Sequence, residues 1–120
     1  MAKNTIQSLS GMLGLAYRGR MIVCGTDISC DAVRAGKAKI LLVSKDASKN
    51  TKKRVFNCAE YYEVYCAELP LTSGQVSDCL GKSGLCAALA VTERNMANGI
   101  MKLINELNAK NSEAATSQEV

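Results

Sequence analysis

Two aspartates, Asp27 and Asp31, come closest in this sequence to a pair of catalytic carboxylates. They lie four residues apart in a segment that is predicted to be helical, so both carboxylates project from the same side of the helix. One could then serve as a general acid and the other as a general base. A structural role is favoured, because the helix dipole stabilises an aspartate in the first turn and a carboxylate such as that of Asp31 can simply face solvent.

Histidine is absent from the sequence. Its absence excludes Ser-His-Asp and Cys-His catalytic groups, imidazole metal ligands and the usual proton shuttle at neutral pH. The sequence also lacks a G-x-x-x-x-G-K-S/T loop and a G-x-G-x-x-G segment after a predicted strand. Gly81-Lys82-Ser83 is a fragment of the first motif, but it precedes a predicted strand and is interpreted as a turn. We therefore expect no enzymatic activity and no bound cofactor.

Six cysteines are spread through the chain, and none forms a C-x-x-C pair. Their spacing does not fit a zinc site, and most of them interrupt apolar segments. We interpret them as small buried hydrophobic residues and expect no metal. An enzyme would need Cys24 or Cys30 as a nucleophile near the start of a helix, and this alternative stays open.

The Gly25-Thr26 turn precedes a predicted helix and could bind an anion through its free backbone N–H groups. The surrounding sequence is strongly basic: the first 54 residues contain 11 lysines and arginines against three aspartates, whereas the rest contains 4 against 8 acidic residues. The cations nearest the turn in sequence are Arg18, Arg20, Arg34, Lys37 and Lys39. This asymmetry favours a polyanionic partner, most simply RNA.

Two further groups of residues have competing interpretations. Lys52, Lys53 and Arg54 are equally compatible with a solvated helix face and with contacts to phosphates. Tyr61 and Tyr62 lie at the end of the same predicted helix, where we expect them to close the core rather than stack on bases.

Apolar segments of helical and strand periodicity alternate along the chain and predict the elements that position the turn. A first helix starts at Thr5 and is ended by Gly19, and a second has Thr26 as N-cap and Gly36 just past its end. Ser48 caps a third helix, a capping box at Thr72 and Gln75 starts a fourth, and a last helix carries Met96 to Leu107. The strands that alternate with these helices are predicted at Met21–Cys24, Ile40–Val43, Val64–Cys66 and Cys86–Val91.

Mostly apolar strands separated by helices predict a sheet that is covered on both faces. The expected fold is an α/β three-layer α/β/α sandwich with a four-stranded mixed sheet. We expect a single domain over residues 1–108 and a disordered polar tail over residues 109–120, which have no periodicity. The longest apolar run, Leu85–Val91, is too short to span a bilayer, so a cytoplasmic protein without a membrane partner is expected.

Six sequence segments together resemble the kink-turn-binding ribosomal protein family, and most closely its bacterial YlxQ-like branch. They are Gly-Arg-Met-Ile-Val-Cys-Gly-Thr-Asp from Gly19, Arg34-Ala-Gly-Lys-Ala-Lys-Ile-Leu-Leu-Val, Lys45-Asp-Ala-Ser-Lys-Asn-Thr-Lys-Lys, Cys58-Ala-Glu-Tyr-Tyr, Leu80-Gly-Lys and Leu89-Ala-Val-Thr. The resemblance covers residues 9 to about 104. It implies a three-layer sandwich that binds a sharply bent RNA between the second helix and the loop before the last strand.

The resemblance also implies which residues contact RNA. The turn and first helical positions, which contact sheared purine pairs in the family, correspond to Gly25, Thr26, Asp27, Ile28 and Asp31. The loop corresponds to Ser83, Gly84, Leu85 and Cys86, where an apolar side chain would pack against an unstacked base. Arg34 and Lys37 complete the expected RNA-binding set as nearby cations.

Asp27, Ile28 and Asp31 replace the Asn, Glu and Lys of the best-known kink-turn binders. An aspartate accepts hydrogen bonds but cannot donate them, and its charge repels phosphate. The expected partner is therefore a structured RNA, either a kink-turn or ribosomal RNA. It would be bound by a modified site or by the basic helices. The ribosome is one candidate partner, and DNA is not expected. The alternative is a protein-interaction module that kept the fold, lost the RNA site and self-associates through Ile28 and Leu85, so both a monomer and a weak homodimer stay open.

Overall fold

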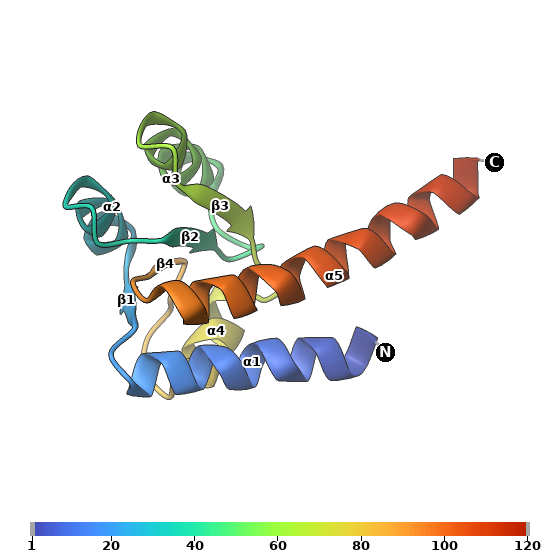
Figure 1. Ribbon diagram of the computed structural model, residues 1–120, viewed down its shortest axis with the longest axis horizontal. Helices are drawn as coiled ribbons and strands as arrows, with labels where there is room; N and C mark the ends of the chain where they lie inside the picture. The colour runs from blue at the N-terminus through green and yellow to red at the C-terminus, as the bar shows by residue number, and fades with distance from the viewer. Residues whose placement is uncertain (1, 120) are drawn as a thin grey trace.

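Helices and strands alternate along the chain in the predicted order (Figure 1). The computed structural model describes the backbone of residues 2–119 and the side chains of residues 6–107. Within that part of the chain, the elements are α1 (Ala2–Arg18), β1 (Ile22–Cys24), α2 (Thr26–Arg34), β2 (Ile40–Val43), α3 (Lys49–Tyr61), β3 (Tyr65–Glu68), α4 (Ser73–Leu80), β4 (Ala88–Val91) and α5 (Arg94–Glu119). The last strand is shorter than predicted, because Cys86 and Ala87 belong to the loop before it.

The four strands form one mixed sheet in the order β1-β4-β2-β3. β4 pairs antiparallel with both β1 and β2, whereas β2 and β3 are parallel. Every residue of the two central strands is buried, as expected for strands that helices cover on both faces. The prediction of a four-stranded mixed sheet is thus confirmed.

Alternate side chains of β2 enter two separate hydrophobic cores. Ile40 and Leu42 belong to the larger core, which contains residues of α1, α4 and α5, whereas Leu41 and Val43 belong to a smaller core that contains residues of α2 and α3. Figure 1 shows α2 and α3 on one side of the sheet and α1, α4 and α5 on the other. The three-layer sandwich is therefore confirmed, and α2 and α3 form one complete outer layer.

Local sequence signals start two of the helices as predicted. The Ser48 hydroxyl accepts a hydrogen bond from the Thr51 backbone N–H at 3.1 Å. At the start of α4, the Thr72 hydroxyl accepts from the Gln75 N–H at 3.1 Å, and the Gln75 side chain accepts from the Thr72 N–H at 2.9 Å. Both caps satisfy N–H groups that a helix leaves without internal partners.

The last helix, α5, continues to Glu119, past the residue at which we expected the domain to end. The side chains of residues 108–120 lie outside those that the structure describes, so the predicted boundary and polar tail stay a prediction. In the described part of the chain, no helix combines the length and the apolar character needed to cross a membrane.

Asp46 connects the loop after β2 to the first turn of α4. Its carboxylate accepts hydrogen bonds from the Ser44 hydroxyl at 2.9 Å, the Ser73 N–H at 2.8 Å and the Ser73 hydroxyl at 3.1 Å. The Ser73 N–H, followed by the Ser44 hydroxyl, holds the pKa of Asp46 below its usual value. The charged carboxylate therefore stabilises this junction.

We expect Asp46→Asn to lower the melting temperature at neutral pH, because an amide accepts these bonds more weakly than a carboxylate. Since the folded-state pKa of Asp46 is lowered, its contribution is present above the unfolded-state pKa and is lost as the pH falls through the folded-state pKa. Thermal unfolding of both proteins across the acidic range tests this: the gap in melting temperature should close as the pH falls. A gap that is constant with pH would contradict the role of the charge.

Candidate nucleic-acid interface

Antiparallel pairing of β1 with β4 brings two of the predicted RNA-binding segments together. Cys24, the last residue of β1, lies opposite Leu89 in the register, and the Gly25 N–H donates to the Ala88 carbonyl oxygen at 2.9 Å. The turn after β1 therefore lies beside the end of the loop before β4. The sheet itself positions the Gly25 turn next to the Ser83–Cys86 loop, although about 60 residues separate them in sequence.

Gly25 is the N-cap of α2, with φ 110° and ψ 143°. A residue with a side chain rarely adopts this conformation, which explains why a glycine stands here. The prediction that Thr26 caps the helix is wrong, because Thr26 is already the first helical residue. None of the side chains of residues 6–107 caps the first turn, so within this part of the chain no hydroxyl or carboxylate blocks its backbone N–H groups.

Hydrogen bonds hold the loop before β4 to α4 on both sides of Leu85. The Ser77 hydroxyl contacts the Lys82 carbonyl oxygen at 3.1 Å and the Gly84 carbonyl oxygen, and the Cys86 N–H donates to the Ser73 carbonyl oxygen at 3.2 Å. Gly84 adopts a left-handed conformation with φ 85°. Between these attachments, Leu85 turns outward.

Two large apolar side chains are exposed at the interface. Ile28, in the first turn of α2, is 56% exposed, and Leu85 is 75% exposed. The Ile28 side chain lies near Gly25, while the end of the Leu85 side chain lies near Gly74 of α4. Both therefore offer apolar surface on the two segments that the pairing of β1 with β4 brings together.

Each aspartate of α2 is paired with an arginine. Asp31 accepts from Arg34 at 2.8 Å, and Asp27 contacts the guanidinium group of Arg54, which comes from α3. The expected repulsion of phosphate by these carboxylates is therefore partly neutralised. All four side chains are more than half exposed, so these ion pairs are weak and a phosphate can compete for either guanidinium group.

The structure separates the predicted cations from the Gly25 turn. Arg34 is the last residue of α2, and Lys37 follows the helix. A nine-residue helix spans about 13 Å, so these two side chains start at the opposite end of α2 from the turn. Arg54 is a cation that lies beside the first turn of α2, where its guanidinium group contacts Asp27. Its position depends on the packing of α3 against α2, which the sequence pattern does not specify.

Cys24 and Cys86 form a pair of thiols beneath the interface. The neighbouring Cys86 thiol, with a smaller contribution from the positive charge of Lys82, lowers the pKa of Cys24 to about 7 against the opposing effect of burial. The proximity of Cys24, followed by burial, raises the pKa of Cys86, whose thiol donates to the Ala88 carbonyl oxygen at 3.5 Å. Cys86 is buried as expected, but Cys24 is half-buried. Among the described side chains, no three histidine, cysteine or acidic residues gather closely enough to hold a metal.

Comparisons with known families and proteins place the chain among similar sequences. Residues 7–107 match the model of the ribosomal protein L7Ae/L30e/S12e/Gadd45 family. The chain is 37% identical over 82 residues to the RNA-binding protein YlxQ of Enterococcus faecium, covering 68% of this chain and 79% of that protein. It is 33% identical over 94 residues to the RNA-binding protein YlxQ of Bacillus subtilis (strain 168), covering 78% and 92%.

Solved structures share the fold. A protein of unknown function from Bacillus halodurans C superposes with a TM-score of 0.76 at 23% sequence identity, covering 81% of this chain and 96% of that one. The 15.5kD RNA binding protein of Giardia lamblia superposes with a TM-score of 0.69 at 13% identity, covering 88% and 89%. At these identities the similarity establishes the architecture alone.

Proposed function

Because the chain belongs to the ribosomal protein L7Ae/L30e/S12e/Gadd45 family, we propose that it is an RNA-binding protein that recognises a sharply bent, structured RNA. The matched region spans both halves of the candidate interface. Two relatives that are 37% and 33% identical to this chain over the aligned residues carry the name RNA-binding protein. Ribosomal RNA in the cytoplasm is the partner class that we propose.

The observation that carries this proposal is the juxtaposition of the Gly25 turn and the Ser83–Cys86 loop through the Gly25–Ala88 hydrogen bond. In this arrangement, the N–H groups at the start of α2 bind phosphate or base oxygens. The exposed Leu85 side chain then packs against a base that the bend has unstacked. A bent RNA presents both features within a short distance, whereas a regular duplex does not expose its bases.

The arginines that pair with Asp27 and Asp31 compensate for the donors that these positions lack. The carboxylate of Asp27 holds the guanidinium group of Arg54 beside the start of α2, where phosphates of a bent backbone would pass. Binding then exchanges a weak, exposed ion pair for contacts between the guanidinium group and phosphate. Arg54 of α3 thus provides a cation at the start of α2, where the residues of α2 itself provide none.

We expect the protein to bind a duplex with a kink-turn in preference to the same duplex with its G·A pairs replaced. Selectivity should persist when salt is raised from about 50 to about 200 mM, because base contacts are less sensitive to salt than phosphate contacts. Asp31→Lys should increase the affinity for the kink-turn by about fivefold or more, since it replaces a repulsive charge by an attractive one. Fluorescence anisotropy titrations of both RNAs with both proteins measure these effects.

Two outcomes would contradict the proposal that the protein recognises a sharply bent RNA. Equal binding of both duplexes that collapses at the higher salt would mean that the protein recognises only backbone charge. Absence of RNA binding would favour a protein-interaction module that uses the exposed Ile28 and Leu85 side chains. Analytical ultracentrifugation of the wild-type protein and of Ile28→Ser/Leu85→Ser tests that second function, since self-association through this surface would be lost in the variant.

A further inference from the structure

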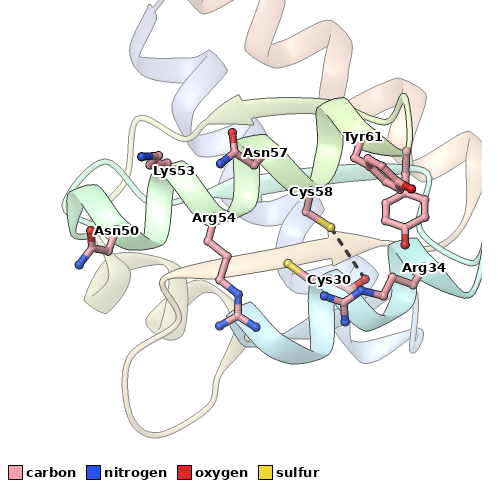
Figure 2. A pocket seen from close by; sticks show the side chains of 9 residues that line it. Cys30, Arg34, Asn50, Lys53, Arg54, Asn57, Cys58 and Tyr61 are labelled. Atoms are coloured by element: carbon pink, nitrogen blue, oxygen red, sulfur yellow. Dashed lines mark hydrogen bonds between the residues drawn. The ribbon is translucent and has the colours of Figure 1, made fainter.

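A groove of about 600 Å³ lies between α2 and α3 on the outer surface of the sandwich. Its volume is within the range of ligand-binding sites, but it is open along its length rather than enclosed. Figure 2 shows α3 on one side of the groove and α2 on the other, with Arg54 reaching from α3 toward α2 and with Tyr61 at the end near Arg34. A chain-like ligand fits an open groove better than a compact small molecule does.

The rim of this α2–α3 groove is positively charged. Arg34, Lys53 and Arg54 are exposed and line it, and none of the residues that line it is acidic. Asp31 and Asp27 stand beside the groove as the exposed partners of Arg34 and Arg54, in ion pairs weak enough for a phosphate to displace. The two asparagines of the rim, Asn50 and Asn57, add amide groups that both donate and accept hydrogen bonds. This combination of cations and amides suits a ligand with phosphates and polar base edges.

The floor of the groove is uncharged. Cys30 and Cys58 lie between the two helices, and the Cys58 thiol donates to the Cys30 carbonyl oxygen at 4.0 Å (Figure 2). Burial, together with the neighbouring Cys58 thiol, raises the pKa of Cys30 to about 11. The thiol is therefore neutral at physiological pH, so no charge in the floor opposes the attraction of the rim for an anion.

Two tyrosines close one end of the groove, and both are exposed. Tyr61 is 80% exposed and Tyr62 is 40% exposed, so the expectation that they close the core is wrong. Their rings meet edge to face, with centroids 4.8 Å apart and planes at 77°. This contact steadies the pair and leaves ring surface facing solvent, where a base can stack.

The groove is continuous with the candidate interface at its other end. Arg54 lines the groove and also contacts Asp27 in the first turn of α2, beside the Gly25 turn. Arg34 and Tyr61 are at or near the C-terminal ends of α2 and α3 and mark the opposite end. A strand that leaves a structured RNA at the Gly25 turn thus meets first a guanidinium group and then an aromatic platform.

We propose that the α2–α3 groove binds a single-stranded RNA segment that extends from the structured RNA, with phosphates on Lys53 and Arg54 and a base stacked on Tyr61. The inference rests on the proposed function, since it assumes that structured RNA occupies the Gly25 turn. It extends that function by a second contact surface, built from α3 and the far end of α2. The resulting recognition combines a bent duplex with an unpaired flank.

The test compares three RNAs: a kink-turn duplex with blunt ends, the same duplex with a single-stranded extension of about six nucleotides, and an oligouridylate of that length alone. The extension should increase the affinity by about fivefold or more, the range that one stacked base gives. Tyr61→Ala should abolish this gain and leave the affinity for the blunt duplex unchanged. Tyr61→Phe should retain the gain, because the ring remains.

Lys53→Gln and Lys102→Gln form a matched pair of charge variants. Lys53 lines the groove, whereas Lys102 is exposed on α5, on the opposite side of the sheet. The gain from the extension should fall in Lys53→Gln and persist in Lys102→Gln. The groove proposal would be refuted if the extension still increased the affinity in both Tyr61→Ala and Lys53→Gln. It would also be refuted if the extension did not increase the affinity although the blunt duplex bound tightly. In both cases the proposed function would stand. Binding of the oligouridylate that depends on Tyr61, without binding of the blunt duplex, would support the groove and refute the bent-RNA proposal.

Discussion

Replacing Arg54 by glutamate should weaken binding of structured RNA by about 10- to 100-fold at about 100 mM salt. The change removes a cation that lies beside the start of α2 and leaves Asp27 facing a second carboxylate. Two negative charges would then repel phosphate at the point where the Gly25 turn is proposed to bind it. The slope of log affinity against log salt should also become shallower by about one, because one phosphate contact is lost. Anisotropy titrations at several salt concentrations provide both quantities.

Lys102→Glu is the matched control, because it changes the net charge of the protein by the same amount. Lys102 is exposed on α5, across the sheet from α2 and α3. We expect its replacement to reduce affinity by less than about twofold, since charges more than a Debye length away are screened. If the two variants lost affinity equally, RNA binding would depend on overall charge and not on the α2 surface. Thermal unfolding verifies that both variants remain folded.

Gly14→Ala should lower the free energy of unfolding by about 2 kcal/mol, although alanine favours helices over glycine. A Cβ atom at position 14 would lie 2.6 Å from the Cys79 carbonyl oxygen, in the backbone of α4. Backbone atoms cannot rotate away as a flexible side chain can, so α1 and α4 would have to move apart. Because α4 carries the loop before β4, this shift would also disturb the Leu85 tip. Urea denaturation measures the change.

Gly11 provides the control on the same helix, three residues earlier. A Cβ atom there has no neighbour within 4 Å, and the position is exposed. We expect Gly11→Ala to raise the free energy of unfolding by up to about 1 kcal/mol, through helix propensity alone. A stabilising effect of Gly14→Ala similar to that of Gly11→Ala would show that the two helices do not pack as closely as described.

The sequence predicts the fold well because local signals specify most of its elements. Ser48, Thr72 and Gln75 cap helices through residues only three positions away, and the apolar runs at Ile40–Val43 and Ala88–Val91 are long enough to specify buried strands. The N-cap of α2 is predicted one residue late. Threonine is expected as the cap because its hydroxyl can accept a hydrogen bond, but glycine suits the positive φ that the chain adopts after β1.

The candidate site is predicted less completely, because its important contacts join segments that are distant in sequence. The contact of Arg54 with Asp27 and the position of Cys24 beside Cys86 arise from the packing of α3 on α2 and of β1 on β4. The spacing of apolar residues along the sequence does not predict contacts between side chains that are distant in sequence. The exposure of Tyr61 was also not predictable from residue type, since a tyrosine at the end of a helix is as suitable for a core boundary as for a surface.

The unequal size of the two cores has a consequence for how the molecule accommodates a ligand. Seventeen buried residues, many of them leucine and isoleucine, hold α1, α4 and α5 to the sheet, whereas eight residues, half of them alanine, hold α2 and α3. Separating α2 and α3 from the sheet exposes less apolar surface and therefore costs less free energy than opening the opposite layer. We therefore expect the lowest-energy fluctuations of the native state in the layer of α2 and α3, the helices that are proposed to face RNA. The larger core would then serve as a rigid base against which that layer could change shape when an irregular RNA binds.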